Sequence, residues 1–328
     1  MTTVEYKYKY GHGYQTFKLE QEHVLDEVKI AEFPPLTDLK AAVLDAIYHP
    51  IASEPIDKLV RPGMKIAFIC NDSTRVANTH DFMPILVDEM NKLGVKDEDM
   101  KIVFALGTHR AMSHEEMVEQ VSEGVALFAQ KHKLFNFNAI LDAQKRFLKI
   151  FAGDWNKSHL EACQFVEQVY GAPISQPADI VIASCGGYPK DINIYQLQKT
   201  MDNAWCAVRE GGVVIILGEC EEGSGSAALE KALQEKALQE NPSPDAIKEA
   251  LAKKFVIGAH KAFAITRLMK KAKFILVSAL DKKLAKDLLF EAVDSVDEAI
   301  ALAEQYIGPD YKILLMPQGS LTVPVVKK

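Results

Sequence analysis

The order of apolar and polar positions along the chain predicts alternating strands and helices. Apolar runs at residues 65–70 and 101–106 stand on either side of a helical pattern that covers residues 81–93. Another helix is expected over residues 113–121. Such alternation is typical of parallel strands with helices on both faces of the sheet.

A second series of the same kind follows after a break. Its apolar runs lie at residues 180–185, 213–217, 274–278 and 312–316, and its helices are expected at about 195–209, between 226 and 268, and at about 295–307. The two series together predict an α/β fold with two doubly wound α/β domains.

Two further segments complete the predicted organisation. Residues 4–19 alternate around a glycine-containing turn, which indicates an N-terminal β-hairpin. Residues 135–155 predict a strand pair with a polar turn, followed by a helix over residues 157–170. We place the domain boundary near residue 150, which gives an N-terminal α/β domain over residues 1–150 and a C-terminal α/β domain over residues 151–328.

Composition narrows the class of protein. The 328 residues carry a formal net charge of −7, and the sequence pI is about 5.8, which argues against nucleic acid as the main partner. The five cysteines are scattered without a Cys-x-x-Cys pair, so neither a disulfide framework nor a thiolate zinc site is expected. This pattern fits a cytoplasmic location. We expect no membrane span, because no window approaches about 18 uncharged apolar residues.

Polar side chains follow the first apolar run, at a strand end where open α/β sheets bind ligands. The run ends at Cys70, and Asn71, Asp72, Ser73, Thr74 and Arg75 fill the turn before the next helix. Two hydroxyls, backbone N–H groups and a guanidinium suit a phosphate or a carboxylate. A helix N-cap with an ion pair is the alternative interpretation.

A histidine follows the second run, in the turn Gly107-Thr108-His109-Arg110. An imidazole titrates near neutral pH, so His109 is a candidate general base. A lone histidine is more often structural. However, His109 and Arg75 leave strands that should be neighbours in the sheet, so both side chains are expected to face one cleft.

The C-terminal series offers two more strand ends. After residues 180–185 come Gly186 and Gly187, which allow close backbone approach to a ligand, and then a helix that presents Gln196 and Lys199 on one face. This pair is suited to holding a carboxylate. The acidic loop over residues 218–226 argues against a phosphate site at the second of these strand ends. A plain loop that leads into a helix is as good an interpretation of this loop as a functional one.

The segments Asn71–Arg75, "ALGTHR", "FAGD" and "GGYPKDINIYQLQK", in this order, resemble those of the lactate racemase family of nickel-pincer-nucleotide enzymes. The resemblance extends from about Lys65 to the C-terminus. It implies two α/β domains that enclose a cleft, a nickel pincer nucleotide as cofactor, and inversion of the C2 centre of a small 2-hydroxy acid. It also implies partner proteins that make and insert the cofactor.

The resemblance assigns roles to single residues. His109 matches a base that takes the hydroxyl proton while hydride passes to the cofactor, and Lys199 is the second catalytic candidate. Arg75, Gln196 and Lys199 match substrate-binding residues. The residues that match the segment holding the cofactor phosphate are Asp72, Ser73, Thr74 and Arg75.

The chain also departs from the family pattern. Members of the family carry a central block with a second base histidine, a Gly-Gly-Arg-Lys-Ser segment whose lysine tethers the cofactor, and a histidine that ligates nickel. This sequence has no such block, and the two halves of the pattern meet near Gly124. We therefore assign no metal ligand.

Three functions stay open at this point. The first is an active 2-hydroxyacid racemase or epimerase, and the second is a shortened homologue that is inactive or only binds its ligand. The third is an NAD-type dehydrogenase, which is disfavoured because no Gly-x-Gly-x-x-Gly follows an early strand.

Overall fold

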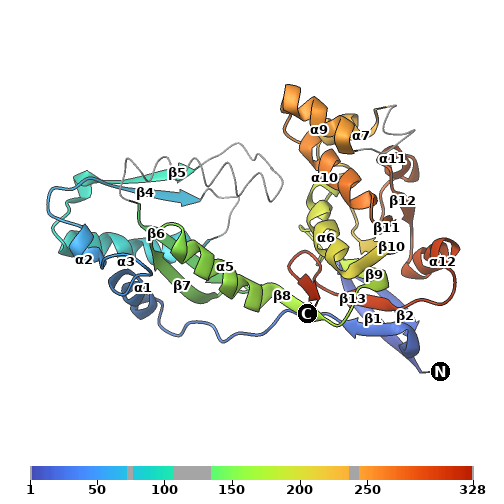
Figure 1. Ribbon diagram of the computed structural model, residues 1–328, viewed down its shortest axis with the longest axis horizontal. Coiled ribbons are helices and arrows are strands. Elements are labelled where there is room, and N and C mark those ends of the chain that lie inside the picture. Colours follow the sequence, from blue (N-terminus) through green and yellow to red (C-terminus); the bar gives the residue numbers. More distant parts are fainter. Residues whose placement is uncertain (1, 72–76, 106–133, 236–243, 327–328) are drawn as a thin grey trace. The chain divides into compact units, whose positions relative to one another are not determined.

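Figure 1 shows the computed structural model, which describes residues 2–71, 77–105, 134–235 and 244–326. Contacts divide the described chain into two compact units. Residues up to 31 together with those from 170 onward form one, here called the C-terminal unit, and residues 32–169 belong to the other, the N-terminal unit. The N-terminal hairpin therefore belongs to the C-terminal unit. The segment from residue 151 to residue 169 belongs to the N-terminal unit.

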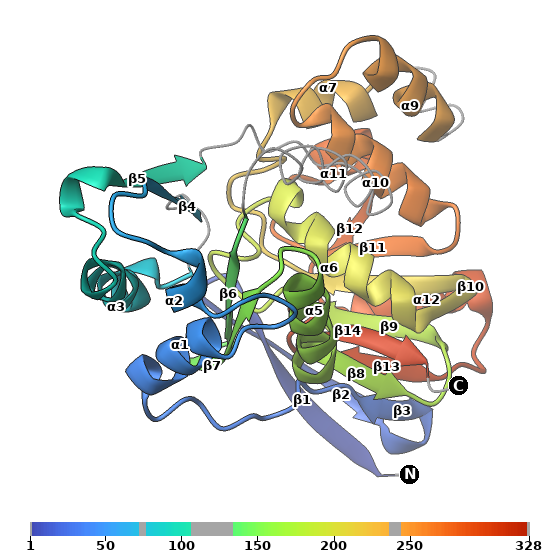
Figure 2. The same cartoon turned by 60° about the vertical axis from the view of Figure 1, so that its left-hand side comes forward.

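The C-terminal unit is built on a six-stranded parallel sheet with the order β12-β11-β10-β9-β13-β3. The strands are β3 (Val24–Glu27), β9 (Ala178–Ser184), β10 (Val208–Leu217), β11 (Lys273–Val277), β12 (Glu291–Val293) and β13 (Ile313–Met316). The central strands are buried on both faces, which explains why they read as continuous apolar runs. Figure 2 shows β9 and β13 side by side.

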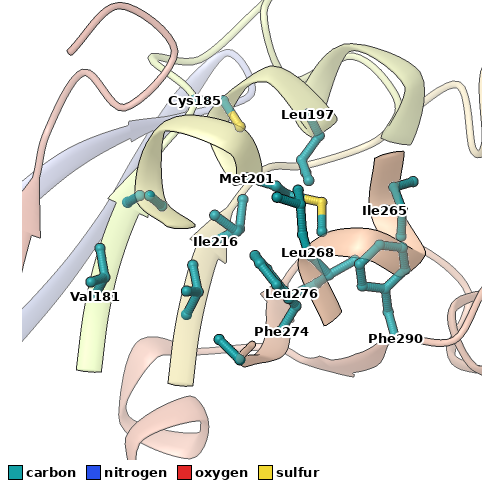
Figure 3. Close-up of a cluster of buried hydrophobic side chains, with 14 of the residues drawn as sticks. Val181, Cys185, Leu197, Met201, Ile216, Ile265, Leu268, Phe274, Leu276 and Phe290 are labelled. Carbon is teal, nitrogen blue, oxygen red and sulfur yellow. The ribbon is translucent and has the colours of Figure 1, made fainter. Parts of the chain in front are cut away.

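Helices cover one face of this sheet. They are α6 (Ile194–Ala207), α7 (Ala227–Leu233), α9 (Pro244–Lys253), α10 (Ala259–Met269) and α11 (Lys282–Asp287). Their apolar side chains form a core with the sheet in which Leu197, Met201 and Ile216 are fully buried (Figure 3). Each buried aliphatic side chain of this size contributes about 1.5–3 kcal/mol relative to exposure.

The other face is covered by α12 (Val296–Ile307) and by the hairpin of β1 (Thr3–Tyr10) and β2 (Gly13–Glu20). Tyr8, Phe17 and Leu19 of the hairpin are buried against the sheet. A short 3-10 helix, Gln21–His23, leads from the hairpin into β3, and a separate pair joins β8 (Gly171–Ile174) to β14 (Val323–Val326). The expected hairpin and doubly wound C-terminal domain are therefore confirmed.

In the described residues of the N-terminal unit, two strand pairs pack with helices. The helices are α1 (Leu39–Tyr48), α2 (Ile56–Leu59), α3 (Thr79–Lys92) and α5 (Lys157–Tyr170), with the 3-10 helix Asp97–Asp99. The strands are β4 (Ile66–Asn71) and β5 (Met100–Ala105), which pair in parallel, and β6 (Asn136–Leu141) and β7 (Phe147–Gly153), which pair antiparallel. The strand, helix and strand expected over residues 65–106 are confirmed, as is the strand pair before residue 155.

Helix α1 was not predicted, although its residues Val43 and Ile47 are buried in the core of the N-terminal unit. The helix expected over residues 113–121 lies outside the described residues. Within the described part of the chain, no helix combines the length and the apolar character needed to cross a bilayer.

Candidate functional site

The strand order of the parallel sheet reverses at one point. From β9 the chain continues to β10, β11 and β12 on one side, whereas β13 returns on the other side of β9. Ligands of open α/β sheets bind at such a point, outside the carboxyl ends of the strands. The segment after β9 and the helix α6 that follows it therefore form the candidate site in this unit.

The second glycine after β9, Gly187, lies against the hairpin. Gly187 has a φ of +74°, and a Cβ placed there would lie 2.9 Å from the carbonyl oxygen of Gly11 at the hairpin tip. The N–H of Tyr188 donates to that same carbonyl at 2.8 Å. The sequence suggested that this glycine admits a ligand, but what approaches its backbone in the structure is the hairpin.

Helix α6 begins beside this segment. The side chain of Asn193 caps it by accepting a hydrogen bond from the N–H of Gln196 at 3.0 Å. Lys199 Nζ donates to Gln196 Oε1 at 2.7 Å, so the two side chains lie together, as their spacing predicts. Lys199 is exposed and Gln196 is half-buried, so both are accessible to a ligand.

The side of α6 that carries Tyr195, Gln198 and Asp202 packs against α10. Lys261 Nζ donates to Gln198 Oε1 at 2.5 Å and lies 5.0 Å from the centre of the Tyr195 ring. Arg267 Nη2 lies 3.2 Å from Asp202 Oδ1. Burial raises the pKa of Asp202 above its usual range, against the opposing effect of its hydrogen bond from Gln198 and of the nearby Arg267 charge.

The N-terminal turn of α10 brings in a residue that the sequence analysis missed. His260 is 5% exposed, and its Nδ1 accepts a hydrogen bond from the N–H of Gly258 at 3.2 Å. Burial, and then the neighbouring Lys261 charge, lower the pKa of His260 to about 4, so the ring is neutral at pH 7. The only sequence signal for it was a glycine followed by the start of an amphipathic helix.

The other predicted site residues follow β4 and β5. These strands are neighbours in parallel register, with Asn71 opposite Ala105, so their carboxyl ends meet at one edge as expected. Asp72, Ser73, Thr74, Arg75 and His109 themselves lie outside the described residues. Their convergence on one cleft and their roles stay predictions.

The nickel cofactor implied by the resemblance requires donor residues. Among the described residues, one group of His, Cys, Asp and Glu has the spacing to hold a metal ion, namely Glu20, Glu22 and His23. His23 Nδ1 lies 3.0 Å from the carbonyl oxygen of Tyr311, just before β13. This group therefore sits at the amino edge of the sheet, whereas α6 begins after the carboxyl end of β9. Because the Gly-Gly-Arg-Lys-Ser segment is also absent from the sequence, the residues described do not fit the cofactor in the family manner.

Comparison with known proteins gives an independent line of evidence. The lactate racemase N-terminal domain matches residues 10–144, and the lactate racemase C-terminal domain matches residues 174–325. A lactate racemase of Thermoanaerobacterium thermosaccharolyticum is 32% identical over 189 residues, which is 56% of this chain and 43% of that protein. A lactate racemase of Lactiplantibacillus plantarum is 28% identical over 373 residues, covering 83% of this chain and 87% of that protein.

The second of these matches also bears on the central block. Since 83% of 328 residues is about 272 residues, about 100 of the 373 aligned positions have no counterpart in this chain. The missing positions are therefore internal to the match; the match does not locate them, and the junction near Gly124 stays a prediction.

Solved structures show the same fold. The lactate racemase apoprotein of T. thermosaccharolyticum has a TM-score of 0.81 at 21% identity and covers 99% of this chain and 100% of its own. A Thermotoga maritima protein has a TM-score of 0.53 at 12% identity, with 90% of this chain and 100% of its own covered. With both of its domain models matched along the chain, this protein belongs to the lactate racemase family.

Proposed function

We propose that this chain is a 2-hydroxyacid racemase or epimerase whose C-terminal unit binds the acid at the exposed face of α6. The observation that carries the proposal is the pair of Gln196 and Lys199, hydrogen-bonded at 2.7 Å beside the point where the strand order reverses. The ammonium group, the amide and the N-terminal half of a helix all favour a bound carboxylate.

The chemistry at the substrate's C2 centre is assigned to the other predicted residues. His109 takes the proton of the substrate hydroxyl, because an imidazole is a base at neutral pH. Arg75 holds the carboxylate with its planar fork. The hydroxyl groups of Ser73 and Thr74, together with the backbone N–H groups of the segment that begins at Asp72, offer donors for a phosphate.

The nickel pincer nucleotide would supply the hydride acceptor for inversion. We assign no step to it, because the described residues and the sequence lack the lysine and histidine that would hold it. Nickel binding, partners that insert the cofactor and a cytoplasmic location are proposals from the family resemblance.

A hydroxyacid-binding homologue without racemase activity is the second candidate. It is favoured by the absence of about 100 internal positions that the L. plantarum racemase possesses. A dinucleotide-dependent dehydrogenase has no comparable support.

The test changes the lysine that carries the proposal. Lys199→Met removes the ammonium group, and Lys286→Met removes an exposed lysine on α11 as the matched control. Binding of L-lactate and L-malate, measured by calorimetry, should weaken about fivefold or more in Lys199→Met, since an exposed charged contact is worth about 1 kcal/mol. Lys286→Met should bind like the parent protein.

Activity distinguishes the two candidates. Protein produced together with cofactor-making enzymes is incubated with each L-acid, and the enantiomers are separated by chiral chromatography, while metal analysis measures nickel. Inversion supports the racemase, and binding without inversion supports the binding homologue. If the parent protein binds neither acid, or if the two lysine variants bind alike, the assignment of the site to α6 is rejected.

A further inference from the structure

The first turn of α10 contains a buried hydrogen-bond donor that lacks an acceptor. A backbone N–H can only donate, so the hydrogen bond from Gly258 requires His260 Nδ1 to be an acceptor. In the neutral ring the proton then resides on Nε2. Nε2 is buried and has no hydrogen-bond partner among the described residues. Buried donors are nearly always paired in folded proteins, so this N–H points to an oxygen that a ligand would supply.

The surroundings of His260 favour an oxygen that carries negative charge. Lys261, the next residue, keeps its ammonium group over the Tyr195 ring at 5.0 Å. The helix α10 has 11 residues, and its N-cap residue, Gly258, provides no side-chain cap, so its N-terminal dipole is not offset by a capping oxygen. An N–H donor, a cation and a helix N-terminus thus occur together.

This turn lies next to the proposed acid site on α6. The Tyr195 ring meets the His260 ring edge to face, with centres 6.1 Å apart. Tyr195 and Lys199 are four residues apart on α6, so they share one face of the helix. Tyr195 therefore belongs to the same helix face as Lys199 and also contacts His260. An acid whose carboxylate lies at Lys199 can extend past this ring toward the imidazole.

Access to the imidazole involves one neighbouring ring. Phe255 stacks on His260 with centres 5.9 Å apart and an interplanar angle of 11°, and it is 37% exposed. Val256 and Ile257, which follow it, are 40% and 49% exposed. We expect a ligand to reach Nε2 by displacing side chains of this exposed segment.

We propose that His260 determines substrate specificity by donating its Nε2–H to an oxygen at the far end of the bound acid. The preferred substrates are then 2-hydroxy acids with a second carboxylate, such as malate, over acids that end in a methyl group, such as lactate. This inference rests on the proposed function, because it presumes that the acid binds at α6.

The test compares two acids on three proteins. His260→Phe keeps an aromatic ring between Phe255 and Tyr195 but removes the donor, and His260→Gln keeps an N–H donor. Calorimetry should show that His260→Phe weakens L-malate binding tenfold or more and changes L-lactate binding less than twofold. His260→Gln should retain malate binding within about threefold of the parent protein. Thermal melting checks that each variant is folded.

The outcomes separate the inference from the proposed function. If the parent protein binds neither acid, the proposed function fails. If it binds both and His260→Phe weakens neither, or weakens both equally, the specificity role of His260 is overturned while acid binding at α6 stands.

A measurement on the unmutated protein covers the case in which His260→Phe does not fold. Nitrogen-15 NMR of the histidine rings should show a His260 tautomer protonated at Nε2, and its signal should shift on addition of malate and stay in place with lactate. A ring protonated at Nδ1, or a signal that ignores malate, would overturn the inference.

Discussion

Gly258 lies where the structure leaves no room for a side chain, so its replacement tests the geometry of the α10 N-terminus. Its φ is +98°, a conformation that an L-residue rarely adopts. A Cβ at this position would lie 2.2 Å from Ser226 Oγ and 3.2 Å from the Cβ of Ala228. Gly258→Ala therefore imposes backbone strain and displaces the Ser226 hydroxyl.

The expected loss of unfolding free energy in Gly258→Ala follows from these two effects. Backbone strain at such a φ costs about 1–3 kcal/mol. The displaced Ser226 hydroxyl caps α7 by accepting from the N–H of Leu229 at 3.3 Å, and loss of a cap costs about 1 kcal/mol. Gly308 in the same unit has a φ of +83° and no atom within 4 Å of an added Cβ, so Gly308→Ala carries the strain alone. We expect Gly258→Ala to lower the free energy of unfolding by at least about 1 kcal/mol more than Gly308→Ala does.

Urea unfolding measures the difference. In a Trp155→Phe background the fluorescence of Trp205, which lies in α6, reports the C-terminal unit, because the chain has two tryptophans. Adding Ser226→Gly to Gly258→Ala removes the clashing hydroxyl. The free energy of unfolding of this double variant should therefore lie closer to that of Gly308→Ala. Equal free energies of unfolding for Gly258→Ala and Gly308→Ala would refute the reasoning.

Two further predictions concern the N-terminal unit. His109→Ala should abolish inversion of the 2-hydroxy acid and leave the melting temperature unchanged; chiral chromatography with retained activity would contradict its role as base. Glu89 is 6% exposed and accepts hydrogen bonds from Lys92 at 2.7 Å and Tyr48 at 2.5 Å, which lower its pKa below the ordinary 4.5. A lowered folded-state pKa means that this stabilisation is complete above the unfolded pKa and is lost as pH falls through the folded value. Glu89→Gln should therefore flatten the fall in unfolding free energy between about pH 5 and pH 3, as followed by urea titrations, and an unaltered slope would argue against it.

The sequence by itself determined the main elements of the fold. The apolar runs became β4, β5, β9, β10, β11 and β13, and the pattern near residue 195 became α6 with Gln196 and Lys199 together on one face. These features depend on periodicity and on neighbours three or four residues apart, which the sequence contains directly. Short strands such as β3, β8 and β14 were not predicted, because four residues carry little periodic signal without their partner strands.

Tertiary structure alone decided which elements surround the candidate site. The hydrogen bond between Lys261 and Gln198 joins residues 63 positions apart, and the contact of Gly187 with Gly11 joins residues even farther apart along the chain. The isolated donor on His260 likewise exists only because α10 packs beside α6 and excludes water from the imidazole. Periodicity shows which face of a helix is buried, whereas the identity of the element that buries it depends on the path of the whole chain.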